Sequence, residues 1–494
     1  MAVKKTELGT GFGCPADLRE YLEVLERAGE LRRVKAEVDW QYEAGAISRL
    51  VNERRGPAPL FENVKDYPGQ QIAAVLMGPS KPALHARIAL ALGLDKNTPT
   101  LDLIEIVRAR LKTPCDPVVV RKEQAACKEV VLTGKDIDLN KFAFPWIKET
   151  LDGGRYLGTW DIVALRDPDT GWLNWATYRC MVKDGNHFAI LLMPAAQHGG
   201  AILRKYEAMG KPMPIAIMIG ANPACHLAAV TAMDHGVAEV SAAGGLMGSP
   251  IPIVRCETSD LEVAASAEMV IEAEILPGDR VDEGPFGEYT GHSAHREKCP
   301  QARVTCITHR KNPIHTMANM GKPWDDAAAN MSVMTPAQAK NRLEAHGLAV
   351  KAVYTLPPDV MVVSLKSGPG LQQRVVSTLT SVPRLAMRGI VFVDEDVDVT
   401  DVEDVWWAIA SRMNPENFDT IKGIGANTLY PWLTPEMRER KQLPFFIIDA
   451  TFPYHWPQEY RDAHTKVSDF KHGWTEETKR KVLARWKEYG YGDL

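Results

Sequence analysis

Two glutamates flank a tight turn in the stretch VDEGPFGEYTG. Pro285 has no amide hydrogen and the two glycines favour a bend, so the sequence predicts that Glu283 and Glu288 lie on a turn. On a straight strand, side chains five positions apart point to opposite faces, but a turn can direct both carboxyl groups into one pocket. Burial and mutual repulsion there would raise the pKa of at least one carboxyl group and give a proton donor near neutral pH. Two surface glutamates on a hairpin loop are the alternative.

An arginine lies in the β-rich, apolar stretch LNWATYRC. The pattern predicts one strand that carries Tyr178 and Arg179, with Asn174 at its start. A guanidinium group in such a run needs an anion, and its planar fork fits a substrate carboxylate or a phosphate. An edge-strand arginine with its head in water is the alternative. Because Asn174 and Arg179 differ in strand parity, a shared site requires a bulge or a ligand that spans the strand.

Asn174 and two further polar residues could bind a metal ion together. Gln197 and His198 precede a predicted helix whose free amides would attract a phosphate, and Glu239 precedes a run of small residues. Asn174, His198 and Glu239 supply an amide oxygen, an imidazole and a carboxylate, a set that suits Mn²⁺ or Mg²⁺ better than zinc. Their separations of 24 and 41 residues match no local metal motif, so structural roles for all three remain open.

Length and composition limit the class of protein. A chain of 494 residues predicts two or three domains, and a net charge of -5 gives no basic surface for nucleic acid, so small molecules are the expected partners. The eight cysteines form no CxxC pair, and the N-terminal residues lack the apolar core of a signal peptide. With no long apolar run, the sequence predicts a reduced, cytoplasmic protein without a membrane span.

The pattern of elements changes twice along the chain. Residues 1–130 alternate helices and strands, 131–330 consist of short β-rich runs typical of a barrel or split barrel, and 331–494 return to α/β alternation. In the first segment, Asp17 is expected to cap a helix that Gly29 ends.

Two helices are expected near the C-terminus. Thr400 and Glu403 form a predicted capping box for a helix over DVEDVWWAIASRM. The amphipathic tail WTEETKRKVLARWKEYGYGDL predicts a terminal helix that docks on its own domain or on a partner subunit.

Several of these motifs together resemble the UbiD-type decarboxylases, which use prenylated FMN. The resemblance rests on NWATYR, the QH pair, Glu239, SDLEVAASAEMVIE and above all EGPFGEYTG, with VDEDVDVTDVEDVWWAIASR and RWKEYGYGD further on. It spans the chain from about residue 15 to its end. It implies an N-terminal α/β domain, a central split β-barrel of flavin-reductase type, and a C-terminal α/β domain that contributes to homodimers or homohexamers.

The resemblance also implies roles for individual residues. Arg179, Glu283 and Glu288 match a catalytic network in which Glu288 donates the proton and Glu283 holds Arg179. The implied ligands of Mn²⁺ (or Mg²⁺), which would bridge to the cofactor phosphate, are Asn174, His198 and Glu239. A K⁺ site would involve Trp175, Ala228, Ala229 and Thr231. The residues implied to contact the cofactor are Asn174, Trp175, Tyr178, Arg179, Gln197, His198, Glu239 and Arg388.

The implied activity is reversible, non-oxidative decarboxylation of an aromatic or heteroaromatic acid through a covalent adduct with prenylated FMN, which a flavin prenyltransferase would supply. Where the family often has a lysine near the cofactor phosphate, this chain has Arg384 and Arg388. Lys322, Trp324 and Asn427 suggest a polar, aromatic-lined substrate pocket. A flavin-dependent oxidoreductase on the same barrel, an enzyme that works as a carboxylase, and a non-catalytic subunit are the alternatives.

Overall fold

The N-terminal part of the chain folds around a four-stranded sheet. The computed structural model describes residues 13–193, 197–381, 387–425 and 429–492. The sheet has the order β1-β2-β3-β18, with strands Leu31–Val38, Ala58–Val64, Gln71–Ala74 and Ile314–Met317. Its helices α1 to α4 are Leu18–Arg27, Glu43–Arg54, Ala86–Ala91 and Thr100–Leu111. The predicted cap of α1 is confirmed, because Asp17 accepts a hydrogen bond from the Glu20 amide, and Gly29 follows the helix with φ +77°.

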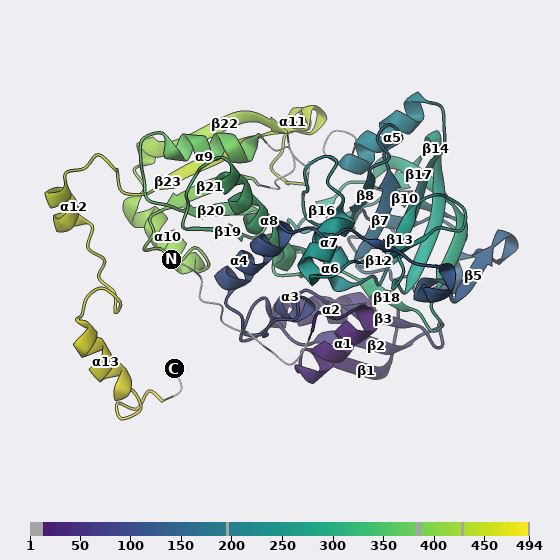
Figure 1. Cartoon of the computed structure of the whole chain (residues 1–494), viewed down its shortest axis with the longest axis horizontal. Helices are drawn as coiled ribbons and strands as arrows, with labels where there is room; N and C mark the ends of the chain where they lie inside the picture. Colours follow the sequence, from purple (N-terminus) through teal and green to yellow (C-terminus); the bar gives the residue numbers. More distant parts are fainter. Residues whose placement is uncertain (1–12, 194–196, 382–386, 426–428, 493–494) are drawn as a thin grey trace.

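A nine-stranded sheet forms the centre of the molecule and curls into a half barrel (Figure 1). Its order is β6-β9-β10-β17-β14-β11-β7-β8, with β5 paired to β17. The strands β5 to β11 are Val130–Thr133, Tyr156–Gly158, Asp161–Arg166, Leu173–Ala176, Cys180–Val182, His187–Ile190 and Met213–Ile219. The two long strands β14 and β17 are Met269–Glu283 and Glu297–His309. Alternate apolar residues of these strands fill one core, so the predicted split barrel is confirmed.

Helices and short strands surround the half barrel. The helices α5, α6 and α7 are His198–Ala208, Pro223–Ala229 and Glu239–Met247. A small sheet joins β4 (Val118–Val119), β12 (Pro252–Arg255) and β13 (Glu262–Ala264), and β15 (Phe286–Gly287) pairs with β16 (Ser293–Ala294). β18, which follows the half barrel in sequence, pairs in parallel with β3 of the N-terminal sheet.

The single strand predicted to carry Tyr178 and Arg179 is wrong. The chain leaves the sheet after Ala176, at the end of β8, and returns at Cys180, where β9 begins. Tyr178 and Arg179 therefore lie in the break between two strands, and strand parity does not constrain where their side chains point.

A five-stranded sheet of order β19-β20-β21-β23-β22 forms the C-terminal part. The strands β19 to β23 are Ala352–Leu356, Val360–Ser364, Gly389–Val393, Phe418–Gly425 and Gln442–Ala450. The helices α8 to α11 are Asp326–Ala345, Leu371–Thr380, Val402–Arg412 and Pro435–Arg440. This arrangement, with the central half barrel, confirms the three-part α/β fold. The predicted capping box of α10 is wrong, because Asp401 accepts the Glu403 amide while Thr400 donates to Asp398.

The last two helices, α12 (Gln458–His464) and α13 (Glu476–Ala484), extend away from the rest of the molecule (Figure 1). Neither helix buries a residue. The expectation that the terminal helix docks on its own domain is therefore wrong, and docking on a partner subunit stays a prediction. Within the described residues, every helix is too short or too polar to cross a membrane.

Candidate active site

Arg179 is held between the two glutamates of the turn. Its Nε and Nη2 atoms donate to the two carboxylate oxygens of Glu283 at 2.9 Å and 2.6 Å, and its Nη1 donates to Glu288. All three side chains are buried, with exposed fractions of 7% for Arg179, 0% for Glu283 and 5% for Glu288. The turn thus brings the two carboxyl groups together, and the surface-hairpin alternative is excluded.

The backbone of the turn explains how this convergence arises. Glu283 is the last residue of β14, and β15 leads from the turn to Glu288, whose amide donates to the His292 carbonyl at 2.9 Å. Gly284 has φ +81°, and a Cβ atom there would lie 2.8 Å from the His295 carbonyl oxygen. Only glycine fits this position without strain, so the sequence at residue 284 fixes the direction of the turn.

The environments of the two glutamates differ. Glu283 accepts three hydrogen bonds, two from Arg179 and one from the Tyr156 hydroxyl at 2.9 Å. Burial raises the pKa of Glu288, although Arg179 opposes the shift. Burial lowers the pKa of Arg179, but the two carboxylates more than offset this, so Arg179 stays a cation. The pair therefore combines a carboxyl group held by three hydrogen bonds with a second one whose pKa is raised by burial.

Arg179 and Glu288 line a cavity at the open edge of the half barrel. The predicted residues Tyr178 and Gln197 line it as well, and Gln197 is fixed by a 2.8 Å hydrogen bond from the Met193 amide to its Oε1 atom. The other described lining residues are Thr159, Trp160, Asp161, Thr177, Leu191, Met193, Val230, Tyr289, Ala318, Met320, Ala327 and Leu429. Most of this wall is apolar, which favours conversion of a charged carboxylate into neutral CO₂.

Two of the pocket residues suggested by the sequence, Lys322 and Trp324, are not among the described residues of this wall. Lys322 is exposed, and Trp324 packs edge-on against His85 with ring centroids 5.9 Å apart. Neither residue is among the described lining residues, so this part of the pocket prediction is wrong. Asn427 lies outside the described residues. The aromatic side chains of the wall are those of Trp160, Tyr178 and Tyr289 instead.

The predicted metal ligands gather around β8. Asn174 lies on this strand, His198 and Glu239 are the first residues of α5 and α7, and both helices pack against the strand. Asn174 donates its Nδ2 hydrogen to Glu239 at 2.8 Å, while its buried Oδ1 accepts no hydrogen bond from the described residues. Such an orphaned amide oxygen beside a buried carboxylate fits a hard cation. In the described part of the chain, no three His, Cys, Asp or Glu side chains form a metal cluster by themselves.

The start of α5 is tied to the cavity wall. The Tyr178 hydroxyl accepts a hydrogen bond from the Gly199 amide at 3.0 Å. A Cβ atom on Gly199 would lie 2.8 Å from that hydroxyl oxygen, so glycine is needed for this approach. Tyr178 therefore links the arginine segment to the helix terminus that was predicted to attract a phosphate.

The remaining predicted cofactor and K⁺ residues are not among the described residues that line the cavity. Trp175 is fully buried on β8, Ala228 and Ala229 belong to α6, and the Thr231 amide donates to the Ala228 carbonyl at 3.0 Å. The K⁺ site stays a prediction. The Arg388 guanidinium lies over the ring of Trp432, 4.7 Å from its centroid, and is not among the described lining residues. Arg384 lies outside the described residues.

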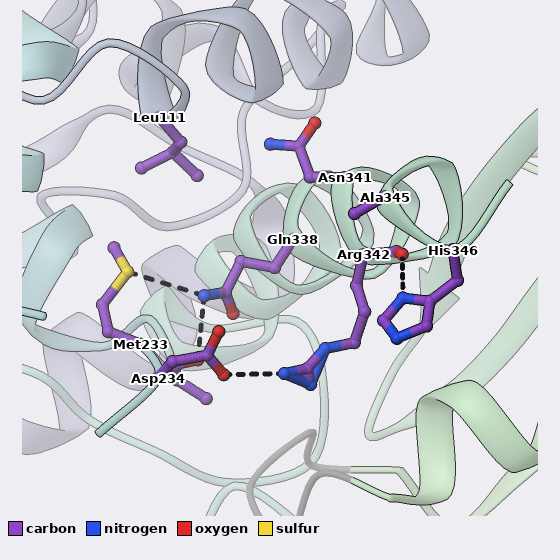
Figure 2. Close-up of a pocket in the computed structure, with 9 residues that line it drawn as sticks. Leu111, Met233, Asp234, Gln338, Asn341, Arg342, Ala345 and His346 are labelled. Carbon is purple, nitrogen blue, oxygen red and sulfur yellow. Dashed lines mark hydrogen bonds and ion pairs between the residues drawn. The ribbon is translucent and has the colours of Figure 1, made fainter. Parts of the chain in front are cut away.

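A second hollow lies where the segment after α6 meets α4 and α8 (Figure 2). Its polar side chains pair with neighbouring protein groups, since Arg342 contacts Asp234 at 2.7 Å and Gln338 donates to the Ala232 carbonyl at 2.8 Å. These contacts join two parts of the fold, and none of the predicted site residues is among the described residues that line this hollow.

Comparison with known proteins identifies the family. The models of the N-terminal, Rift-related and C-terminal domains of 3-octaprenyl-4-hydroxybenzoate carboxy-lyase match residues 22–107, 118–323 and 331–442. The chain belongs to the UbiD family. UbiD proteins of this kind are carboxy-lyases, so the chain belongs to an enzyme family whose named members are decarboxylases.

Similar UbiD proteins match over nearly the whole chain. The pyrrole-2-carboxylic acid decarboxylase of Pseudomonas aeruginosa is 32% identical, with 97% of this chain and 99% of that protein covered. The closed form of the vanillic acid decarboxylase of Sedimentibacter hydroxybenzoicus has a TM-score of 0.85 at 34% identity, over 96% and 99% of the two chains. An evolved dimeric form of a UbiD-class enzyme from Pelotomaculum thermopropionicum, in complex with prFMN, has a TM-score of 0.74 at 29% identity, over 90% and 96% of the two chains.

Sequence reasoning missed several residues of the site. Tyr156 donates to Glu283, and Lys148 and Asp152 contact the turn from a loop more than 130 residues earlier. Asp161 lines the cavity, and burial raises its pKa well above the ordinary value. A carboxylate at the start of the apolar strand DIVALR was a signal that could have identified Asp161; the other three residues carry no comparable local pattern.

Proposed function

We propose that this chain is a prFMN-dependent decarboxylase of an aromatic or heteroaromatic acid, with Glu288 as the proton donor. The observation that carries the proposal is the buried Arg179 held between Glu283 and Glu288 at the cavity wall. The names of the relatives support the substrate class, because they act on pyrrole-2-carboxylic and vanillic acids. The complex of a similar enzyme with prFMN supports the cofactor.

The chemistry requires one proton in each cycle, since the carboxylate and a proton become the product C–H bond and CO₂. When bound, prFMN would supply the electron sink for the pair left on carbon. Three N–H groups of Arg179 are used by the glutamates, which leaves two of its five to orient the substrate carboxylate. Glu283 would hold Arg179 in place, and Glu288 would give its proton to the carbon that CO₂ leaves.

The residues around β8 would hold the cofactor phosphate. Asn174 Oδ1, His198 and Glu239 would bind Mn²⁺ or Mg²⁺, and the start of α5 with Gln197 would face the phosphate. A K⁺ site near Trp175 and α6, and a contact from Arg388, complete the proposed set. The enzyme would work in the cytoplasm, where its eight free cysteines stay reduced, as a homodimer or homohexamer supplied by a flavin prenyltransferase.

The test begins with protein produced together with a flavin prenyltransferase. We expect a flavin absorbance spectrum, CO₂ release from aromatic acids such as pyrrole-2-carboxylate or vanillate, and deuterium from D₂O at the vacated carbon. Glu288→Gln should lower kcat by about 100-fold or more, since general acid catalysis contributes on that scale. The matched control is Glu297→Gln, because Glu297 lies opposite Glu283 in the register of β14 and β17 but is exposed. Full activity of E288Q would reject the proton-donor role, and NADH oxidation without CO₂ release would favour an oxidoreductase.

The metal proposal has a separate test. His198→Ala should lower the metal content, measured by elemental analysis, and the flavin content, measured by absorbance, together. The control is His187→Ala, because His187, the first residue of β10, pairs with Asp184 in the turn before that strand and was not predicted to bind a metal. Unchanged metal occupancy in H198A would reject the grouping of Asn174, His198 and Glu239.

A further inference from the structure

A lysine contacts the segment from Glu283 to Glu288, called the glutamate turn below, through the backbone of Gly287. The Lys148 Nζ atom lies 3.4 Å from the Gly287 carbonyl oxygen, 3.9 Å from Asp152 Oδ2 and 5.1 Å from the centroid of the Phe286 ring. The Arg179 guanidinium lies over the same ring at 5.2 Å. Two cations thus flank the segment that leads to Glu288.

The contact between Lys148 and the turn is close. A Cβ atom on Gly287 would lie 2.8 Å from Cδ and Cε of Lys148, so the lysine side chain occupies the space that the glycine leaves. The Gly287 amide donates to Asp152 Oδ1 at 2.9 Å. Lys148 and Asp152 therefore engage both backbone polar groups of the residue immediately before Glu288.

Lys148 and Glu288 differ in what they face. Glu288 lines the substrate cavity, whereas Lys148 is not among the described lining residues. The Lys148 side chain keeps an exposed fraction of 14%, while the Asp152 side chain is fully buried. The Lys148 side chain is therefore not fully enclosed, and its ammonium group contacts the turn from outside the described cavity wall.

The proposed decarboxylation requires Glu288 to be reprotonated after each turnover. Glu288 loses a proton in every cycle, and it is buried and hydrogen-bonded to Arg179, which cannot release a proton near neutral pH. The charged groups that act on Lys148 are Asp152, Glu288, Asp325 and Arg49, and burial lowers the pKa of Lys148 despite the three carboxylates. This lysine therefore releases a proton more easily than an exposed lysine does.

We propose that Lys148 returns the proton to Glu288 after each turnover, as a positioning and proton-relay residue outside the substrate cavity. In this step an N–H bond of the Lys148 ammonium breaks and an O–H bond forms on the Glu288 carboxylate. The neutral amine then takes a proton from water and leaves hydroxide in solution, which balances the proton that the lost carboxylate consumes. The inference rests on the proposed function, since only a proton-donating Glu288 needs to be reprotonated.

The test compares Lys148→Met with Lys148→Arg in the cofactor-loaded enzyme. Arginine keeps the charge and length of the side chain but cannot give up its proton, so both variants should lose kcat by about tenfold or more with KM little changed. A small primary amine added to K148M should restore part of the lost rate. Melting temperatures check that both variants fold.

A matched control is Lys183, which follows β9 directly. Lys183 donates to the Asp282 carbonyl at 2.8 Å, next to Glu283 and not to Glu288, so K183M and K183R should keep kcat. If K148R keeps the wild-type kcat while K148M is impaired, Lys148 is a fixed charge and the relay is overturned; activity of both variants overturns it as well. If wild-type enzyme releases no CO₂ and incorporates no deuterium, the proposed function itself fails.

Discussion

Gly153→Ala should displace the glutamate turn without changing a charged residue. The Gly153 amide donates to the Pro285 carbonyl at 2.8 Å, so this loop lies directly against the turn. A Cβ atom at residue 153 would lie 2.2 Å from the Gly284 carbonyl oxygen and 2.6 Å from its carbon. Ordinary contacts of a Cβ atom begin near 3.4 Å, so the two backbones must separate by about 1 Å.

The size of the effect follows from this displacement. A misplacement of about 1 Å in a catalytic constellation costs on the order of 100-fold in rate, or about 2.7 kcal/mol of transition-state stabilisation. Because Gly284 follows Glu283 directly, the shift should reach the carboxylate that holds Arg179. Overpacking of this kind should also lower the free energy of unfolding by about 1–3 kcal/mol.

The adjacent glycine provides the control. A Cβ atom on Gly154 would meet the end of the Met181 side chain at 2.7 Å, and a flexible thioether can move where a backbone cannot. We therefore expect G153A to lose kcat/KM for decarboxylation by about 100-fold while G154A stays close to wild type. Equal activity of the two variants, with G153A folded by its melting curve, would refute the argument that this loop positions the turn.

Three further predictions follow from buried titratable groups. Because burial raises the pKa of Glu288, kcat should fall as the pH rises through that pKa and the donor loses its proton; a pH–rate profile that rises there would contradict the role. Tyr156→Phe removes a hydrogen bond to the charged Glu283 and should lower the free energy of unfolding by about 1.5–3 kcal/mol in denaturant titration. Burial raises the pKa of Asp359 from 3.8 to about 7, so the folded state binds a proton that the unfolded state has lost, and stability falls as the pH rises between these values. Asp359→Asn should abolish that fall, seen as a smaller difference in unfolding free energy between about pH 5 and pH 8.

The parts of the fold and site that the sequence predicts correctly are those encoded locally. Pro285 and its glycines specify a bend within a few residues, and Asp17 and Gly29 bound α1 by the hydrogen bonds and backbone angle that these residue types favour. The prediction that Arg179 lies on a strand is wrong because it also rests on the local sequence alone. The apolar neighbours of Arg179 resemble a continuous strand, whereas the sheet pairing that decides where a strand ends involves β6 and β7, which lie elsewhere in the sequence.

Long-range contacts decide the roles of the two glutamates, and no local pattern carries them. Glu283 and Glu288 are the same residue type on the same turn, yet of the two carboxylates it is Glu283 that accepts a hydrogen bond from Tyr156, which is 127 residues away in sequence. Lys148 contacts the carbonyl of Gly287, which is 139 residues away in sequence and directly precedes Glu288. One carboxylate therefore accepts hydrogen bonds from three donor atoms, and the other is buried with a weaker set of donors and a lysine nearby. This asymmetry supports the proposal that one glutamate holds the arginine while the other exchanges a proton, and it arises only when the loop before β6 packs against the turn.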